Sequence, residues 1–203
     1  MNKKLTIRLM TGFTVSAAIA LIIFVWLVIT GGFPKETSKV EDYLCKEDYW
    51  GHGQLLIFPE ELPKYDDGIT YYFYCRDTIF QPTCQIYLKC TYNEDDYEKE
   101  CNRLSNISVT YEGQTQNTRF EENSFPLPAY VTMNGWCSCY EYALVNEAEH
   151  TIEYIYLQQN VEDAIKFDLD KLPDTYGIQE YEGLSEFSIY HFETPNGGYV
   201  SAY

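Results

Sequence analysis

The chain has 203 residues, of which 31 are acidic and 14 are lysine or arginine, so its formal net charge is −17 at pH 7. Three basic residues and no acidic ones lie before position 9, which leaves 11 − 31 = −20 on the rest of the chain. A surface this acidic repels nucleic acid and anionic lipid, so no nucleic acid is expected as a partner. The content of Tyr, Phe, Ile and Leu excludes a disordered chain, and the length suits one domain with a real core.

An uncharged run occupies residues 9–33. As a helix, this run is about 37 Å long, and the hydrocarbon core of a bilayer is about 30 Å thick. Lys3, Lys4 and Arg8 precede the run, and positive charge at this end predicts that residues 1–8 form a cytoplasmic basic stub. We therefore expect a transmembrane helix that anchors a single-pass protein in the cell membrane, with the C-terminal domain extracytoplasmic.

A cleaved signal peptide is the alternative for the same run, and it would release the domain as a secreted protein. Signal peptides share the charge polarity, but their apolar core is about 7–15 residues long and ends at a small-x-small site. The run is longer than this, and Thr30-Gly31-Gly32 makes a poor cleavage site. The sequence therefore favours an uncleaved signal anchor.

Gly12, Ser16 and Ala20 are spaced four apart, so they form one stripe of the predicted helix. Small residues at this spacing let two membrane helices approach closely, which would suit a subunit of a membrane complex. The alternative is that small residues are simply common in membrane segments.

Three further segments follow the predicted anchor: a short polar tether at residues 34–44, an extracytoplasmic domain at 45–194 and a loose C-terminal tail at 195–203. Near the start of the domain, apolar and polar residues alternate over residues 69–76 and again over 85–92. Alternation with many aromatic residues predicts two strands.

A short helix is predicted directly after the second of these strands. Asn93 is a suitable N-cap, and three acidic residues follow it in the first turn, where carboxylates complement the helix dipole. Tyr97, Cys101 and Leu104 recur at i, i+4 and i+7, so they form one apolar stripe. The helix is expected to end at Ser105 or the next residue.

The strongest hairpin signal of the chain is Asn134-Gly135, which stands between two stretches rich in strand-forming residues. Its second arm is expected to be long, from Trp136 to Val145. A further strand is predicted over residues 151–158.

Two short strands are predicted around residues 107–111 and 118–120, joined through Glu112-Gly113. Many strands with tight turns and one clear helix indicate α+β architecture. The expected domain is a mainly antiparallel sheet that the short helix packs on one face.

Seven cysteines occur, so at least one thiol is unpaired in any disulfide pattern. We expect Cys90 and Cys101 to point into the layer between sheet and helix, and Cys137 and Cys139 to share one face of a neighbouring strand. A disulfide between these two sets and buried core thiols are the two interpretations. Cys137 and Cys139 lack the two-residue gap of redox and zinc motifs, so no metal is expected.

No catalytic signature is present: the sequence contains no GxSxG, no HExxH, no phosphate-binding glycine loop and no dinucleotide fingerprint. Asp66-Asp67-Gly68 lacks the spaced oxygen ligands and the terminal glutamate of a calcium loop. We therefore expect no cofactor and assign no catalytic residue.

Most of the domain is covered by the segments CQIYLKCTYNEDDYEKECNRLSNI, YEYALV, TIEYIYLQ and FDLDKLPDTYG. Together they resemble segments of small uncharacterised bacterial proteins that are anchored in the membrane by a single pass. Those proteins carry an acidic, Tyr-rich extracytoplasmic domain. The shared segments describe strands, a helix and turns, so the resemblance implies a bacterial membrane-anchored protein and no mechanism.

Tyrosine contributes 20 residues, all of them beyond the predicted anchor. It is a strand former that is also common at recognition surfaces. Our first hypothesis is a domain that binds a protein or ligand without catalysis, through a tyrosine-bearing sheet face. The alternatives are a membrane-anchored hydrolase that uses acidic residues, and a structural subunit of a membrane complex.

Overall fold

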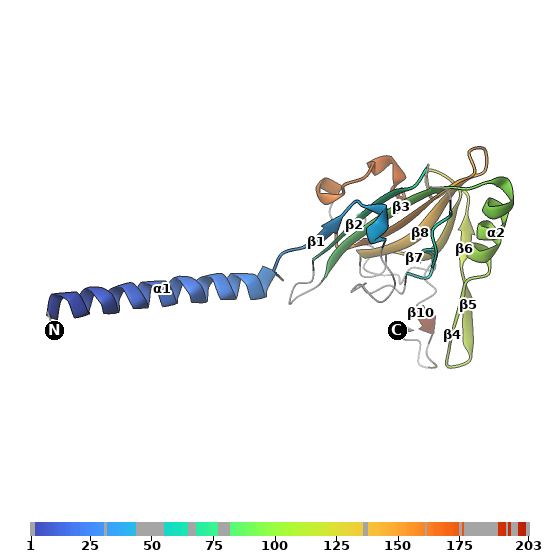
Figure 1. Ribbon diagram of the computed structural model, residues 1–203. Helices are drawn as coiled ribbons and strands as arrows, with labels where there is room; N and C mark the ends of the chain where they lie inside the picture. The colour runs from blue at the N-terminus through green and yellow to red at the C-terminus, as the bar shows by residue number, and fades with distance from the viewer. Residues whose placement is uncertain are drawn as a thin grey trace.

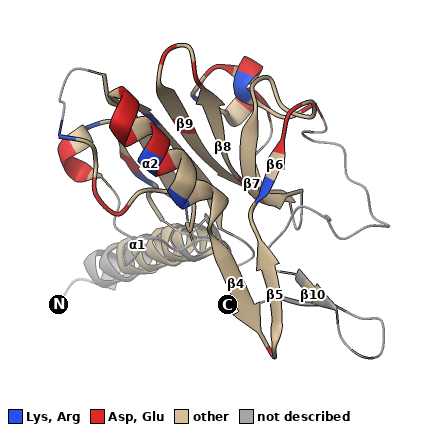
Figure 2. Ribbon diagram, turned by 90° about the vertical axis from the view of Figure 1, so that its right-hand side faces the viewer, with Lys and Arg blue, Asp and Glu red and all other residues tan. Residues whose placement is uncertain are grey.

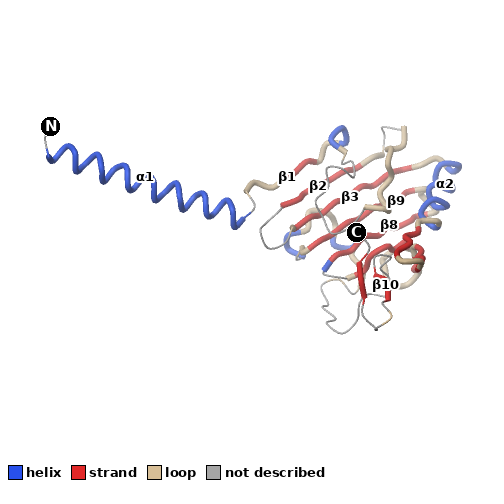
Figure 3. Tube along the Cα trace, turned by 90° about the horizontal axis from the view of Figure 1, so that it is seen from below, coloured by secondary structure: helices blue, strands red, loops and turns tan. Residues whose placement is uncertain are grey.

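The computed structural model describes residues 3–30, 32–43, 55–64, 68–76, 82–135, 138–160, 162–174, 176, 191–193, 195 and 199–201. Its main element is an antiparallel sheet of seven strands in the order β1-β2-β3-β9-β8-β7-β6, against which helix α2 packs (Figures 1 and 3). The prediction of an α+β domain with a mainly antiparallel sheet and a short packing helix is confirmed.

The strands of the main sheet are β1 (Lys35–Thr37), β2 (Thr70–Arg76), β3 (Thr83–Thr91), β6 (Arg119–Glu121), β7 (Ala129–Asn134), β8 (Cys139–Asn146) and β9 (Thr151–Gln158). Two smaller antiparallel pairs are β4 (Ser108–Tyr111) with β5 (Gln114–Asn117), and β10 (His191–Glu193) with β11 (Tyr199–Ser201). The helices are α1 (Lys3–Thr30) and α2 (Glu94–Ser105), and three short 3-10 turns are η1 (Val40–Asp42), η4 (Glu162–Ala164) and η5 (Leu169–Lys171).

The two alternating segments form β2 and β3, which lie side by side in the sheet. In β2, Tyr71 and Phe73 are buried, while Tyr72 between them is only half-buried. Ile86 and Leu88 of β3 are buried on the same face of the sheet as Tyr71 and Phe73, as their shared core cluster shows. Alternation therefore predicted correctly which side chains face the core.

Helix α2 begins as its sequence predicts. The side chain of Asn93 accepts a hydrogen bond from the backbone N–H of Asp96 (2.9 Å), which satisfies one of the free donors of the first turn. Tyr97 and Leu104 are buried against the sheet, and Cys101 between them is half-buried. The predicted stripe is thus the face that attaches the helix.

β7 and β8 form the hairpin predicted from Asn134-Gly135. Gly135 has a φ of +85°, which glycine adopts at no steric cost, and its N–H donates to the carbonyl of Cys139 (2.9 Å). Trp136 and Cys137 lie outside the described residues. The strand of the second arm begins at Cys139 and pairs with β9 on its other side.

The two short strands predicted around residues 107–111 and 118–120 are present as β4 and β6, but a further strand, β5, lies between them. Glu112 and Gly113 have φ values of +47° and +83°, which fits a two-residue turn, so the second arm starts directly after them as β5. The β4–β5 pair projects from the rest of the domain (Figure 1). Residues 119–121 form β6, which pairs with β7 at the edge of the main sheet.

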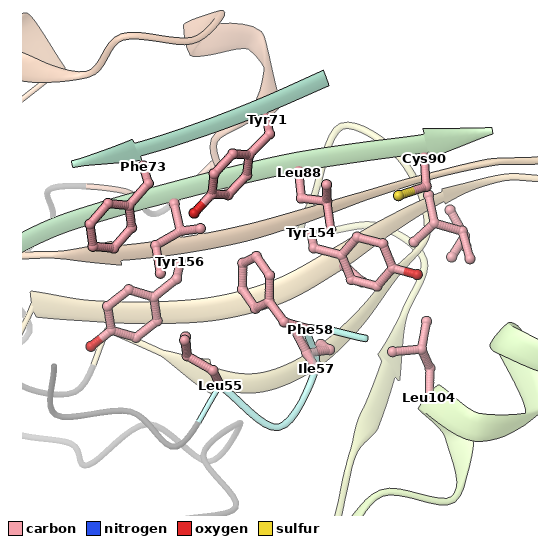
Figure 4. Close-up of a cluster of buried hydrophobic side chains, with 14 of the residues drawn as sticks. Leu55, Ile57, Phe58, Tyr71, Phe73, Leu88, Cys90, Leu104, Tyr154 and Tyr156 are labelled. Atoms are coloured by element: carbon pink, nitrogen blue, oxygen red, sulfur yellow. The ribbon is translucent and has the colours of Figure 1, made fainter. Parts of the chain in front are cut away.

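One face of the main sheet is covered by α2 and by residues 55–59, hereafter the strap. Leu55, Ile57 and Phe58 of the strap are at most 4% exposed. Figure 4 shows Ile57 and Phe58 beneath Tyr154 of β9, and the ring centroids of Phe58 and Tyr154 are 5.9 Å apart. This layer is the larger part of the core.

Two charged side chains hold the backbone of the strap. The N–H of Ile57 donates to Oε1 of the buried Glu141 (2.9 Å), and its carbonyl accepts from Nη2 of Arg103 (2.6 Å). Arg103 also donates to the carbonyl of Leu56 (3.2 Å). The strap is therefore tied to β8 on one side and to α2 on the other.

The other face of the sheet is covered by residues 122–128 and 162–174, which have no regular periodicity in the sequence. Phe125 from the first segment lies 4.8 Å, between ring centroids, from the fully buried Tyr142 of β8. Ile165 from the second packs into the same cluster. The sheet is thus covered on both faces, whereas the sequence predicted packing on one.

Helix α1 extends away from the domain on the side opposite α2 (Figures 1 and 3). The large apolar side chains of residues 12–26 are exposed, among them Phe13 (77%), Leu21 (62%) and Phe24 (63%). Within the described residues, no helix combines the length with the apolar character that crossing a membrane requires. The transmembrane helix predicted for residues 9–33 is therefore not confirmed.

A glycine closes the end of α1. Gly32 has a φ of +72°, and its N–H donates to the carbonyl of Leu27 (2.9 Å), which closes the last turn. Residues 34–44, predicted as a tether, contain β1 and η1, and β1 pairs with β2 in the main sheet. The hydroxyl of Tyr43 donates to the carbonyl of Pro59 in the strap (2.8 Å). These residues are thus part of the folded domain.

The predicted C-terminal tail at residues 195–203 contains β11, which pairs with β10.

Candidate functional site

A cavity of about 400 Å³, hereafter the α2 cavity, lies between α2 and the end of the sheet formed by β6, β7 and β8. Its chemically distinctive lining residues fall into two groups, the carboxylates Glu94, Glu98 and Glu147 and the aromatic rings Tyr97, Phe120 and Tyr130. Cys101 and His150 line it as well. All three glutamates and Phe120 are exposed, so this side of the cavity opens to solvent.

The helical repeat places four of these residues together. Glu94 and Glu98 are one turn apart on α2, and so are Tyr97 and Cys101. Figure 2 shows acidic residues gathered on the ribbon of α2, which lies in front of the sheet. Because Leu104 is fully buried at the C-terminal end of the same helix, the position of the whole group relative to the sheet is fixed.

Two ring pairs flank the cavity. The rings of Tyr97 and His150 have centroids 5.3 Å apart, and those of Phe120 and Tyr130 are 4.9 Å apart. Phe120 is 48% exposed at this edge of the sheet. One pair thus comes from α2 and the turn after β8, and the other from β6 and β7.

The thiol of Cys101 is not an activated nucleophile. Burial raises its pKa, and the carboxylates of Glu100 and Glu147 add to the rise, although a hydrogen bond with Tyr97 opposes it. Burial likewise raises the pKa of Tyr97. Both groups are therefore protonated at neutral pH, whereas reactive cysteines have a lowered pKa.

A buried polar network lies behind the cavity and attaches α2 to β9. The hydroxyl of Tyr154 donates to Oε1 of Glu100 (2.7 Å) and lies 2.7 Å from the hydroxyl of Tyr92. Glu100 also accepts two hydrogen bonds from Arg103, at 2.6 Å and 2.8 Å. Through Arg103 the network continues into the backbone of the strap.

Another nearly buried carboxylate, Glu153 of β9, is held on the opposite face of the sheet. It accepts from the hydroxyl of Tyr87 (3.0 Å) and lies 3.4 Å from Nζ of Lys89 and 3.7 Å from Nζ of Lys171. Glu100, Glu141 and Glu153 thus each bind groups of their own chain that join separate elements. Their arrangement is that of structural carboxylates.

A second cavity of about 430 Å³, hereafter the β1 cavity, lies at the other edge of the sheet. It is also acidic, but Lys35 is part of its lining. Glu36 accepts from the hydroxyl of Tyr72 (3.1 Å), and Asp42 accepts from the hydroxyl of Thr37 (2.8 Å). The local chain therefore already supplies hydrogen-bond donors to two carboxylates of this cavity.

Of the cysteines singled out from the sequence, Cys90 and Cys101 lie in the same core cluster, as predicted, and Cys139 belongs to a separate one. Cys90 and Cys139 are buried thiols, and Cys101 is a half-buried thiol in the α2 cavity. Cys137 lies outside the described residues. The disulfide of the structure joins Cys75 to Cys84, which face each other in the register of β2 and β3.

The signal for that disulfide was present in the sequence. With alternating strands at residues 69–76 and 85–92, an antiparallel hairpin brings the end of the first strand close to the start of the second. Cys84 was missed because it stands one residue before the predicted strand.

The stripe of Gly12, Ser16 and Ala20 is exposed on α1, and a side chain at Gly12 would meet nothing within 4 Å. Within the part of the chain that is described, no group of three or more His, Cys, Asp or Glu side chains is arranged to hold a metal ion.

No protein-family model, no curated protein and no solved structure matches the chain. The resemblance to bacterial membrane-anchored proteins therefore stays a prediction.

Proposed function

We propose that the chain is a membrane-anchored module whose extracytoplasmic domain binds a partner protein, without catalysis, at the α2 cavity. The observation that carries the proposal is the combination of an open cavity with exposed Phe120 at its rim and three glutamates around it. Exposed aromatic rings beside polar groups are typical of recognition sites. The protonated Cys101 thiol and the structural use of the buried carboxylates favour binding over hydrolysis.

The binding surface proposed here differs from the tyrosine-bearing sheet face that the sequence suggested. Tyr71, Tyr142, Tyr154 and Tyr156 are at most 2% exposed because both faces of the sheet are covered. The tyrosine that remains accessible at the cavity is Tyr130, which is half-buried in the lining.

The anchor is the second part of the proposal. It rests on the uncharged run at residues 9–33, on the three basic residues before it, and on the exposed apolar side chains of α1. Apolar side chains exposed along a helix are stabilised when lipid or another helix covers them.

Photo-crosslinking in cells tests the binding site. We expect a photoreactive phenylalanine analogue in place of Phe120 to give one discrete adduct, and the same analogue at Glu112, the exposed turn of the β4–β5 pair, to give none. The adduct should be lost when Leu127→Trp fills the cavity. Cys101→Phe serves as a second filling variant in case the first does not fold. Adducts that persist in both folded filling variants would contradict the site.

Thiol labelling in intact cells tests the anchor and its orientation. A membrane-impermeant reagent should label Glu112→Cys above the background of the unsubstituted chain, and should label Lys3→Cys only after the cells are opened. Labelling of Glu112→Cys only in opened cells would show that the domain is not outside.

A further inference from the structure

The described lining of the α2 cavity has the chemistry that suits a positive charge. Three glutamates line it, and no lysine or arginine does. Among the described residues, the side-chain carboxylates of Glu94, Glu98 and Glu147 have no hydrogen bond or ion pair. All three residues are exposed, so their carboxylates are open to a cation from outside.

The cations of α2 are engaged elsewhere. Nζ of Lys99 lies 2.8 Å from Asp96, and Arg103 is bound to Glu100 and to the strap. Neither Lys99 nor Arg103 lines the cavity. Asp96 and Glu100 are thus paired with cations of the helix, whereas Glu94 and Glu98 in the cavity, like Asp95 outside it, have no cation of the helix beside them.

The aromatic lining has the same preference. The faces of Phe120, Tyr130 and Tyr97 carry the negative part of the ring quadrupole, which attracts an ammonium or guanidinium group within about 6 Å. A cationic side chain also has an apolar stem that can cover ring edges. Carboxylates at the rim and rings in the wall thus suit the same occupant.

We propose that the α2 cavity binds a lysine or arginine side chain of a basic segment of the partner protein. This rests on the proposed function and names the chemistry of the partner. The net charge of −20 beyond the anchor attracts such a segment over a longer range and speeds its encounter. The volume of about 400 Å³ lies within the about 300–1,000 Å³ of small ligand sites, so one or two side chains enter rather than a folded element.

Peptide binding to the purified full-length chain in detergent tests the proposal. The probe is the labelled peptide acetyl-Lys-Gly-Lys-Gly-Lys-amide, followed by fluorescence polarisation, and its control has glutamine in place of each lysine. We expect the lysine peptide to bind at least about tenfold more tightly than the glutamine peptide, and more weakly as salt is raised.

Isosteric variants locate the binding. The triple variant Glu94→Gln, Glu98→Gln and Glu147→Gln should weaken binding of the lysine peptide by at least about tenfold. Asp95→Asn, an exposed residue of the same helical turn that does not line the cavity, should change it by less than twofold. Phe120→Leu should weaken it about threefold if the ring contributes through its face.

Unchanged binding in the triple variant would overturn the proposal. So would a loss in Asp95→Asn as large as the loss per charge in the triple variant, because it would show attraction by net charge alone. Absence of lysine-peptide binding to the unsubstituted chain would also overturn it. The adduct at Phe120 is measured independently, so a failure of the cationic chemistry is distinguishable from a failure of the binding site.

Discussion

The α2 cavity and the β1 cavity are close in size, about 400 and 430 Å³, and both are lined by acidic residues. They differ in what the carboxylates contact. In the β1 cavity, Glu36 and Asp42 accept hydrogen bonds from the hydroxyls of Tyr72 and Thr37, and Lys35 stands beside them. In the α2 cavity, the glutamates have no such contact within the described residues.

The difference separates two uses of negative charge in one acidic domain. Carboxylates that accept donors from their own chain fix a local conformation, here the approach of β1 to β2. Carboxylates left to water create a field that another molecule can meet. Net charge alone would not distinguish the two cavities, whereas their hydrogen bonds do.

The largest effect is expected where α2 is attached, because the α2 cavity depends on the position of this helix and the β1 cavity does not. Arg103→Met removes two hydrogen bonds to Glu100 and two to the strap. It leaves a mostly buried carboxylate without its cation, so we expect a loss of about 2–3 kcal/mol in the free energy of unfolding, measured by urea denaturation.

The matched control is Lys166→Met, since Lys166 is an exposed cation on the opposite face of the sheet. Its unfolding free energy should change by less than about 0.5 kcal/mol. If both variants lose the same amount, the attachment of α2 does not depend on Arg103.

A smaller effect is expected from the hydroxyl in the network behind the cavity. Tyr154→Phe removes the group that donates to Glu100 and contacts Tyr92, at a cost of about 1–2 kcal/mol of unfolding free energy. Tyr74→Phe, which alters a half-buried ring on β2, should cost less than about 0.5 kcal/mol in the same measurement. If both variants lose the same free energy of unfolding, Tyr154 stabilises the fold through the packing of its ring rather than through the hydrogen bonds of its hydroxyl.

The smallest effect is expected in the pH dependence of α2. Hydrogen bonds from Lys99 and Asn93 hold the pKa of Asp96 below its usual range. Because the folded-state pKa is the lower one, the stability that Asp96 contributes is present above the unfolded pKa and is lost as the pH falls through the folded pKa.

Carboxyl NMR titration of Asp96 checks this prediction. Lys99→Met should move its pKa up toward the usual value, and Lys166→Met should leave it unchanged. If the pKa of Asp96 does not change in Lys99→Met, the carboxylate of Asp96 is not held by Lys99. It would then not differ from the carboxylates of α2 that have no cation beside them.

Local sequence patterns predicted those helices and strands that depend on residues close together in the sequence. The alternation in β2 and β3, the cap at Asn93, and β9 at residues 151–158 all follow from neighbouring residues. β5 was missed, although the two-residue turn at Glu112-Gly113 is a local signal that the second arm starts directly after it.

Local patterns could not predict the candidate site or the layer that covers the second face of the sheet. Glu98 and Glu147 are far apart in sequence and meet only because β8, β9 and α2 pack together. Residues 162–174 cover a sheet face without regular periodicity, so their burial left no signal. Consequently the sheet tyrosines, expected on a binding surface, are in the core.

The strand order of the main sheet sets the distance between the α1 side of the domain and the α2 cavity. β1, the strand that follows α1, is at one edge of the sheet (Figure 3), while β6 and the α2 cavity are at the other edge. Six strand spacings of about 4.8 Å separate the two edges, a span of about 29 Å. Whatever holds α1, the α2 cavity lies at the opposite edge of a rigid sheet. A molecule bound in the cavity is thus kept at a fixed distance from the edge of the sheet that follows α1.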